Sequence, residues 1–88
     1  MAQLDGKIAI VTGGASGIGE GTVRKFVESG ARVVISDVQD ARGEKLAEEL
    51  GPNASYYHTD VAQEEEVRAA VAHAVQKWGR LDVMFNNA

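Results

Sequence analysis

A glycine-rich run near the start of the chain constrains the possible folds more than any other feature. The run reads TGGASGIG at 12–19 and joins an apolar segment at 7–12 to an amphipathic one. Glycine is required where φ is positive or where a Cβ has no room, so we expect Gly13 to make a tight turn and Gly19 to let the next helix pack closely. Gly17 would let the backbone approach a phosphate, next to the positive end of that helix. The run therefore predicts a strand-turn-helix unit that can hold two phosphate charges without a lysine.

The flanking segments decide between such a loop and ordinary turn glycines, because glycine also occurs in turns and helix caps for structural reasons alone. Residues 7–12 form a continuous apolar run of strand length, which is typical of a strand buried on both faces of a parallel sheet. Gly30 follows the amphipathic segment, where a glycine would end the helix. The apolar stripe predicted for that helix is Ile18, Val23, Phe26 and Val27. This context favours the phosphate loop.

A second apolar run at 32–36 predicts a strand that delivers Asp37 to its carboxyl end, with Val38 beside it. A carboxylate about twenty residues beyond the glycine turn can accept hydrogen bonds from both hydroxyls of an adenine ribose. It would also repel a 2′-phosphate, by up to about 4 kcal/mol for unit charges roughly 4 Å apart at an effective dielectric constant near 20. Asp37 also fits an ordinary turn at a strand end. With the glycine run beside it, we expect Asp37 to favour NAD over NADP.

The rest of the chain continues the same alternation of strands and helices. The remaining predicted elements are a helix at 41–50 capped by Asp40 and stopped by Gly51-Pro52, a strand at 54–59, a helix at 63–78 and a strand at 81–85. Right-handed crossovers convert this order into an α/β fold, a Rossmann-type doubly wound parallel sheet that is truncated after the fourth strand and has strand order 3-2-1-4. The carboxyl ends of its strands, where ligands of such sheets bind, then carry Gly13, Asp37, Asp60 and Asn87.

Each of the two later helices has one apolar face, which we expect to be buried. These faces consist of Ala41, Leu46, Ala47 and Leu50 in the first, and of Val67, Ala70, Val71, Ala74, Val75 and Trp78 in the second. The charged residues Arg42, Glu44, Lys45, Glu48 and Glu49 would then point to solvent. Met84 and Phe85 are expected in a buried strand.

The chain resembles the classical short-chain dehydrogenase/reductase family in four motifs that occur in the family's order. They are the glycine run at 12–19, Asp37, the pair Asp60-Val61, and Asn86-Asn87-Ala88, which matches the start of an Asn-Asn-Ala-Gly motif. The resemblance covers the whole chain and implies that residues 1–88 are the N-terminal, incomplete part of a single NAD(P)-binding Rossmann domain.

Roles for individual residues follow from this resemblance. It implies that Ser16, Gly17 and Ile18 line the pyrophosphate, and that Asp60 and Val61 contact the adenine. It further implies that Asn87 and Ala88 meet the ribose on the nicotinamide side through backbone atoms. Asn86 is expected to tie the fourth strand to the glycine loop.

The resemblance also implies an NAD-dependent oxidoreductase that moves a hydride between the cofactor and a small alcohol or carbonyl substrate, and that assembles as a homodimer or homotetramer. The family's catalytic serine and its Tyr-x-x-x-Lys motif are expected beyond Ala88, because Asp60 and Val61, not lysines, stand four places after Tyr56 and Tyr57. We therefore expect no catalytic residue within 1–88. These residues alone should bind NAD weakly and transfer no hydride.

The composition argues against several other kinds of partner. The 88 residues carry a net charge of −4 and no cysteine. We therefore expect no nucleic-acid partner, since no basic face would neutralise phosphates, and no disulfide or thiolate metal site. His58 and His73 do not show metal-ligand spacing, so no metal is expected. Without a signal peptide's apolar core or a run of membrane-spanning length, we expect no membrane partner and a cytoplasmic location.

Two other functions remain open at this point. One is a free-standing NAD-binding or regulatory module without catalysis. The other is an S-adenosylmethionine-dependent methyltransferase, since those enzymes also place a glycine loop and an acid after the first two strands. The Thr12-Gly13 opening and the Asn-Asn-Ala segment fit the dehydrogenase better.

Overall fold

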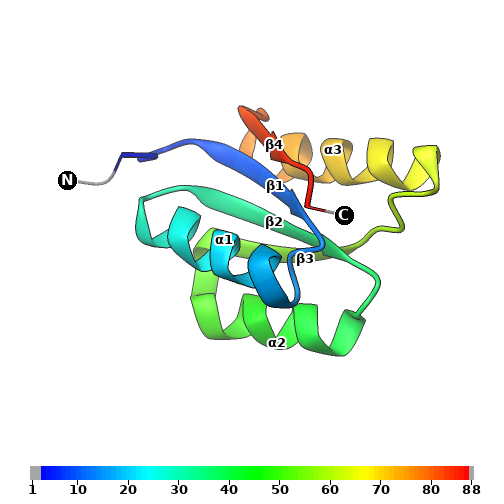
Figure 1. The fold of residues 1–88 in the computed structure, drawn as a ribbon. Coiled ribbons are helices and arrows are strands. Elements are labelled where there is room, and N and C mark those ends of the chain that lie inside the picture. Colours follow the sequence, from blue (N-terminus) through cyan, green and yellow to red (C-terminus); the bar gives the residue numbers. More distant parts are fainter. Residues whose placement is uncertain (1–2, 88) are drawn as a thin grey trace.

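The computed structural model describes residues 3–87 as a parallel four-stranded sheet with helices on both faces (Figure 1). The elements are β1 (Ile8–Thr12), α1 (Gly17–Glu28), β2 (Arg32–Asp37), α2 (Asp40–Leu50), a short 3-10 turn (Gly51–Asn53), β3 (Ala54–His58), α3 (Glu64–Trp78) and β4 (Val83–Phe85). The strand order is β3-β2-β1-β4, which confirms the predicted order and fold class. Every predicted element is present, and their ends differ from the prediction by two residues at most.

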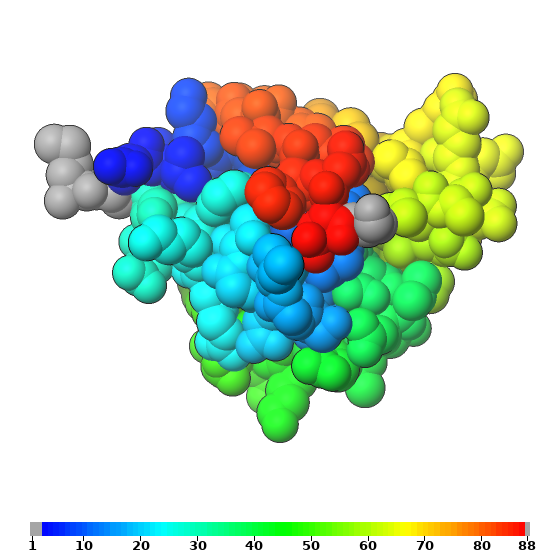
Figure 2. Space-filling model, in the orientation of Figure 1, coloured from blue at the N-terminus to red at the C-terminus, as the bar shows by residue number. Residues whose placement is uncertain are grey.

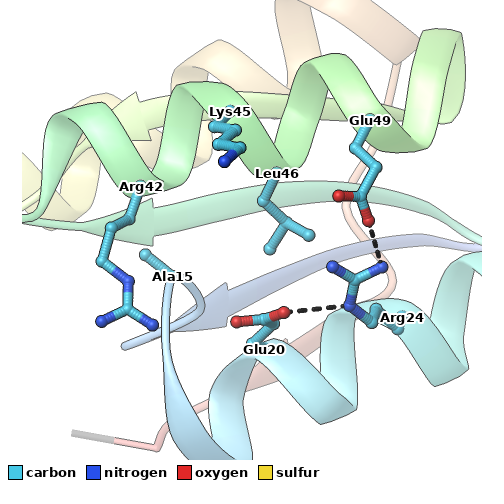
Figure 3. Close-up of a pocket in the computed structure, with 7 residues that line it drawn as sticks. All are labelled: Ala15, Glu20, Arg24, Arg42, Lys45, Leu46 and Glu49. Atoms are coloured by element: carbon cyan, nitrogen blue, oxygen red, sulfur yellow. Dashed lines mark hydrogen bonds and ion pairs between the residues drawn. The ribbon is translucent and has the colours of Figure 1, made fainter.

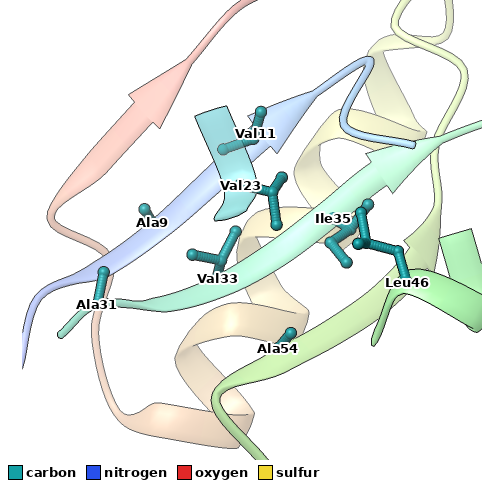
Figure 4. Close-up of a cluster of buried hydrophobic side chains, with 8 residues drawn as sticks. All are labelled: Ala9, Val11, Val23, Ala31, Val33, Ile35, Leu46 and Ala54. Carbon is teal, nitrogen blue, oxygen red and sulfur yellow. The ribbon is translucent and has the colours of Figure 1, made fainter. Parts of the chain in front are cut away.

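Two apolar clusters fill the space between the layers, one on each face of the sheet. The first lies under α1 and α2 and is built around Val23, Val33, Ile35 and Leu46 (Figure 4). The second lies under α3, where Ile10 and Val34 pack against Ala70 and Ala74. Successive residues of β1 and β2 alternate between these clusters and are buried on both sides, apart from Arg32, as the continuous apolar runs predict.

The register brings the carboxyl ends of the strands to one edge. Thr12 lies opposite Ser36, and Asp37 lies opposite His58. This edge is at the right of Figure 1, where α2 and α3 also begin. The residues that the sequence placed at strand ends therefore share one side of the molecule.

The helices confirm the predicted faces only in part. Ile18 and Val75 were expected in buried stripes, but 76% and 43% of their surfaces are exposed. Ala41 is exposed as well, and Gly43 takes the buried place beside Leu46 in α2. Ile18 lies in the first turn of α1, at the carboxyl edge of the sheet, where residues 3–87 leave most of its side chain uncovered. Helical spacing predicted the helices correctly but not where their buried faces begin and end.

Two further expectations were wrong. Asp40 does not cap α2: Gln39 occupies that position, and Asp40 is the first residue of the helix. Phe85 is 36% exposed, because β4 is an edge strand of the described sheet and only its β1 side is paired. Its ring still packs edge-on against Phe26 of α1, with 6.2 Å between the ring centroids.

Candidate nucleotide-binding site

The glycine loop between β1 and α1 has the conformation that its sequence predicts. Gly13 and Gly17 have positive φ values of 63° and 57°, which L side chains rarely adopt. A Cβ on Gly19 would lie 1.8 Å from the carbonyl oxygen of Gly13, so only glycine lets the first turn of α1 approach the loop this closely. A Cβ on Gly17 would meet nothing within 4 Å, so the space above it is open to a ligand.

The first turn of α1 points unpaired N–H groups at this space. Ser16 is the N-cap in extended conformation, and its side chain makes no capping hydrogen bond. Within 3–87, no acceptor is found for the N–H groups of Gly17, Ile18 and Gly19. Such donors, together with the helix dipole, make a site for a phosphate anion. Ser16 Oγ instead accepts a hydrogen bond of 3.1 Å from Gln39 Nε2, which joins this loop to the one after β2.

Asp37 is fixed by backbone groups from two loops. Its Oδ2 accepts from the N–H of Ala15 at 3.0 Å, and its Oδ1 accepts from the N–H groups of Val38 and Gln39 at 2.7 and 3.2 Å. Burial raises the pKa of this carboxyl, but the hydrogen bonds together outweigh burial and leave the pKa below its usual value. Asp37 is therefore ionised at neutral pH. A carboxylate offers about four acceptor sites, so capacity remains for a ligand hydroxyl.

A cavity of about 170 Å³ opens beside Asp37 at the carboxyl edge. It is lined by Gly13, Asp37, Val38, Thr59, Asp60 and Val61. Val38 and Val61 are 54% and 44% exposed although both are apolar, and they come from the loops after β2 and β3. A flat apolar group that entered the cavity would cover both valines while its polar atoms met the two carboxylates.

Asp60 holds the loop after β3 as well as facing the cavity. Its Oδ1 accepts from the N–H of Ala62 at 2.9 Å, and its own N–H donates to Glu66 Oε1 at 2.8 Å. The hydrogen bonds of the described part of the chain leave its second carboxylate oxygen without a donor, so that oxygen can accept from a ligand amino group.

The segment after β4 reaches back to the glycine loop through Asn87. The Asn87 N–H donates to Thr12 Oγ1 at 2.9 Å, and its Nδ2 lies 3.5 Å from the carbonyl oxygen of Gly13. The expectation that Asn86 makes this tie was wrong, because Asn86 is exposed and Asn87 takes the role. Figure 2 shows this segment, in red, against the start of α1. Ala88 lies outside the described residues.

Sequence reasoning missed a second cavity that borders the glycine loop. It measures about 270 Å³, lies between α1 and α2, and is lined by Ala15, Glu20, Arg24, Arg42, Lys45, Leu46 and Glu49 (Figure 3). Arg24 is paired with Glu20 and Glu49. Arg42 and Lys45 are exposed, as predicted, but they also face this cavity. Their spacing of three residues on one helix face was the available signal.

Comparison with known families agrees with this geometry. The family model described as short chain dehydrogenase matches residues 7–88, which include the glycine loop, Asp37 and the Asp60 loop. The chain belongs to the short-chain dehydrogenase family.

Relatives within the short-chain dehydrogenase family are much longer than this chain. It is 61% identical over 87 residues to momilactone A synthase from Oryza sativa subsp. japonica, and the matched region is 98% of this chain but 32% of that protein. It is 60% identical over 87 residues to short-chain dehydrogenase reductase 3b from Arabidopsis thaliana, and the matched region is 98% of this chain and 34% of that protein. The chain thus spans about a third of the length of these relatives.

The same arrangement of strands and helices occurs in a solved structure. The 3-ketoacyl-(acyl-carrier-protein) reductase from Brucella melitensis complexed with NADH matches with a TM-score of 0.90 at 41% identity, over 93% of this chain and 34% of that one.

Within 3–87, no cluster of three or more His, Cys, Asp or Glu side chains could hold a metal ion. No helix in the same range has the length and apolar character needed to cross a membrane.

Proposed function

We propose that the protein carrying this chain is an NAD-dependent oxidoreductase that interconverts an alcohol and a carbonyl compound, and that residues 1–88 supply its cofactor site. The observation that carries the proposal is Asp37: an ionised, buried carboxylate fixed between the glycine loop and the cavity of about 170 Å³. The relative crystallised with NADH, a 3-ketoacyl reductase, supports both the cofactor and a carbonyl substrate.

The residues present fit a dinucleotide. The open space over Gly17 and the free N–H groups at the start of α1 would hold the pyrophosphate, with Gly13, Ser16, Ile18 and Gly19 shaping the loop. Asp37 would accept from the adenine ribose, and Val38, Asp60 and Val61 would enclose the adenine. The Asn87 N–H is already bonded to Thr12, so of its backbone only the carbonyl group is left to meet the second ribose. When bound, the nicotinamide supplies the hydride chemistry, and the protein supplies binding and orientation.

The preference for NAD over NADP follows from charge at Asp37. Its lowered pKa keeps the carboxylate charged, so a 2′-phosphate would meet a buried negative charge. We expect the complete protein to bind NAD at least about tenfold more tightly than NADP, since about 1.4 kcal/mol of repulsion is enough for that ratio. Arg42 and Lys45 face the neighbouring cavity and would remain available to a phosphate once Asp37 is neutralised.

Isothermal titration of the complete protein with NAD, NADP and S-adenosylmethionine tests the proposal. In Asp37→Ala the ratio of the two dissociation constants should narrow, chiefly through tighter NADP binding. Equal or tighter binding of NADP by the parent protein would contradict the NAD preference. Binding of S-adenosylmethionine in place of either dinucleotide would reopen the methyltransferase alternative, which the family assignment disfavours.

A cofactor-binding module without catalysis is the second candidate. It stays open because residues 1–88 carry a cofactor site, while the catalytic motif that the family resemblance implies is expected beyond Ala88. Hydride transfer by the complete protein with small secondary alcohols or ketones distinguishes the two: turnover supports the enzyme, and NAD binding without turnover supports the module. Assembly as a homodimer or homotetramer stays a prediction that sedimentation of the complete protein would test.

A further inference from the structure

A chain of polar contacts runs behind the cavity of about 170 Å³ and has no part in the proposed function so far. His58, the last residue of β3, lies between two carboxylates: its Nδ1 is 2.7 Å from Asp40 Oδ1 and its Nε2 is 3.8 Å from Glu66 Oε1. The Tyr56 hydroxyl lies on the same side of β3 and donates to the same Asp40 oxygen. We call Asp40, Tyr56, His58 and Glu66 the His58 bridge.

The position of β3 allows one side chain to reach both helical layers. β3 is the edge strand of the described sheet on the side opposite β4. Asp40 is the first residue of α2 and Glu66 is in the first turn of α3, and these helices cover opposite faces. From the end of the edge strand, His58 therefore connects the starts of two helices that the sheet otherwise separates.

Each end of the His58 bridge holds one wall of the cavity. On the α2 side, the Tyr56 hydroxyl also lies 2.7 Å from the carbonyl oxygen of Asp37. On the α3 side, the same Glu66 oxygen that faces His58 accepts the N–H of Asp60 at 2.8 Å. Val38 and Val61 follow Asp37 and Asp60 directly and line the cavity with them. Tyr56 has one hydroxyl proton, which is shared between Asp40 and the Asp37 carbonyl oxygen. A change in the bridge therefore reaches the Asp37 wall through this shared donor, and the Asp60 wall through the hydrogen bond to Glu66.

The two ends differ in how they depend on the proton of His58. A neutral imidazole with hydrogen on Nδ1 still donates to Asp40 at 2.7 Å. At 3.8 Å, Nε2 makes an ion pair with Glu66 rather than a hydrogen bond, and that pair exists only when the ring is protonated. Loss of the proton therefore releases the Glu66 end and keeps the Asp40 end.

The groups around His58 all favour its charged form. They are Asp40 on α2, Glu66 on α3 and Asp60 in the loop after β3, while the Tyr56 phenol shares Asp40. The hydrogen bond to Asp40 is the largest cause, and it holds the pKa of His58 above its usual value in spite of some desolvation. His73 behaves in the opposite way, because burial and then Lys77 lower its pKa.

We propose that His58 is a pH-sensitive positioning residue for the adenosine end of the cofactor. When protonated, His58 strengthens cofactor binding by holding the Asp40 and Glu66 sides of the cavity together. The proposal rests on the proposed function, since it needs a dinucleotide in this cavity. Deprotonation weakens binding in two ways. Glu66 loses its ion pair with His58 and keeps only the N–H of Asp60, so the Asp60 wall is held less firmly. The cavity that receives an anionic cofactor also becomes more negative. Because the pair is partly exposed, we expect the effect to be about two- to fivefold in the dissociation constant.

The first experiment measures the dissociation constant of NAD for the complete protein between pH 6 and pH 9. The parent protein should bind more weakly as pH rises through the pKa of His58, above about 6.5. His58→Gln should bind at the weaker value throughout and lose most of the pH dependence. The matched control is His73→Gln. In the parent, the His73 ring lies at the middle of α3, hydrogen-bonds to Ser55 and stacks on Tyr57. This variant should keep the pH profile of the parent.

Glu66→Gln separates positioning from simple packing. A glutamine can still accept the N–H of Asp60 but carries no charge to pair with His58, so it should flatten the pH profile without further loss at high pH. Glu66→Ala should weaken binding at every pH. In NMR titrations without cofactor, the His58 pKa should fall in Glu66→Gln, and the Asp60 amide shift of the parent should follow the His58 midpoint.

The outcomes distinguish this proposal from the proposed function. If the parent binds NAD but His58→Gln keeps its pH profile, or if the Asp60 amide does not respond to His58, the positioning role is wrong and the cofactor assignment stands. If the parent binds no NAD at any pH, both fail. Reciprocal linkage adds one more requirement: saturating NAD must raise the His58 pKa by the same free energy that protonation adds to binding.

Discussion

Gly19 and Gly21 lie two residues apart in α1 but have different physical roles. Gly19 is buried against the carbonyl oxygen of Gly13, so close that a Cβ would clash with it. A Cβ on Gly21 would meet nothing within 4 Å. Both are helical glycines, so each carries the same intrinsic cost relative to alanine. The difference between them isolates the part that close approach plays in the glycine loop.

We expect Gly19→Ala to destabilise the complete protein by about 1–3 kcal/mol, because the new methyl group must displace the backbone of Gly13. The same shift should weaken NAD binding, since Gly13 lines the cavity. Gly21→Ala is the matched control and should stabilise the protein by about 0.5–1 kcal/mol. Urea unfolding measures both changes, and a Gly19→Ala variant as stable as Gly21→Ala would contradict the packing argument.

Individual side-chain partners were the least predictable feature of the site. Asp37 could be placed at the end of β2 from the sequence, but its bond to the Ala15 N–H depends on how two loops meet. Asn86 and Asn87 are chemically identical, and which one reaches the glycine loop is decided by the direction of the chain after β4. Asp40 is of a residue type that often caps helices, but its carboxylate is hydrogen-bonded to Tyr56 and His58 instead of to the N–H groups of α2.

At the scale of elements, α2 is fitted to β3 by a glycine. A Cβ on Gly43 would lie 2.1 Å from the ring of Tyr56, and that ring is held by its hydroxyl contacts to Asp37 and Asp40. We expect Gly43→Ala to cost about 1–3 kcal/mol of unfolding free energy, although alanine gains about 1 kcal/mol in helix propensity. In a Tyr56→Ala background the cost should disappear. A double-mutant cycle by urea unfolding measures this coupling, and additive costs would contradict it.

The elements themselves were predictable because each rests on a local pattern. Continuous apolar runs predicted β1 and β2, glycines marked the ends of α1 and α2, and the alternation of strands and helices predicted the sheet order. The buried faces were less predictable, since periodicity does not say how far a covering layer extends. Ile18 and Val75 keep helical spacing with buried residues, but 76% and 43% of their surfaces are left exposed by the described part of the chain. Gly43 was missed because a glycine adds nothing to an apolar pattern.

Across the whole molecule, several carboxylates titrate below their ordinary range for different reasons. Hydrogen bonds from backbone N–H groups outweigh burial to lower the pKa of Asp37, and the Ile8 N–H with Arg80 lowers that of Asp82. Tyr56 and then His58 lower the pKa of Asp40, and Arg24 lowers that of Glu49. A carboxyl whose folded pKa is depressed stabilises the fold above its unfolded pKa, and this contribution is lost as pH falls through the folded value.

The stability of the protein should therefore fall below about pH 4, where unfolded carboxyl groups begin to take up protons. The raised pKa of His58 should add a smaller loss as pH rises through the folded pKa of that ring. Asp37 is the diagnostic residue because it is 93% buried and its hydrogen bonds come from two loops. Asp37→Asn should be less stable than the parent at pH 7, because both carboxylate oxygens accept N–H groups and an amide replaces one of them with an NH2 donor. The two proteins should converge in stability as the pH falls below the folded pKa of Asp37. Asp5→Asn, at an exposed position before β1, should follow the parent curve throughout. Thermal unfolding of the complete proteins at a series of pH values measures all three, and a constant difference between Asp37→Asn and the parent from pH 7 to pH 2 would show that the Asp37 charge does not contribute to the fold.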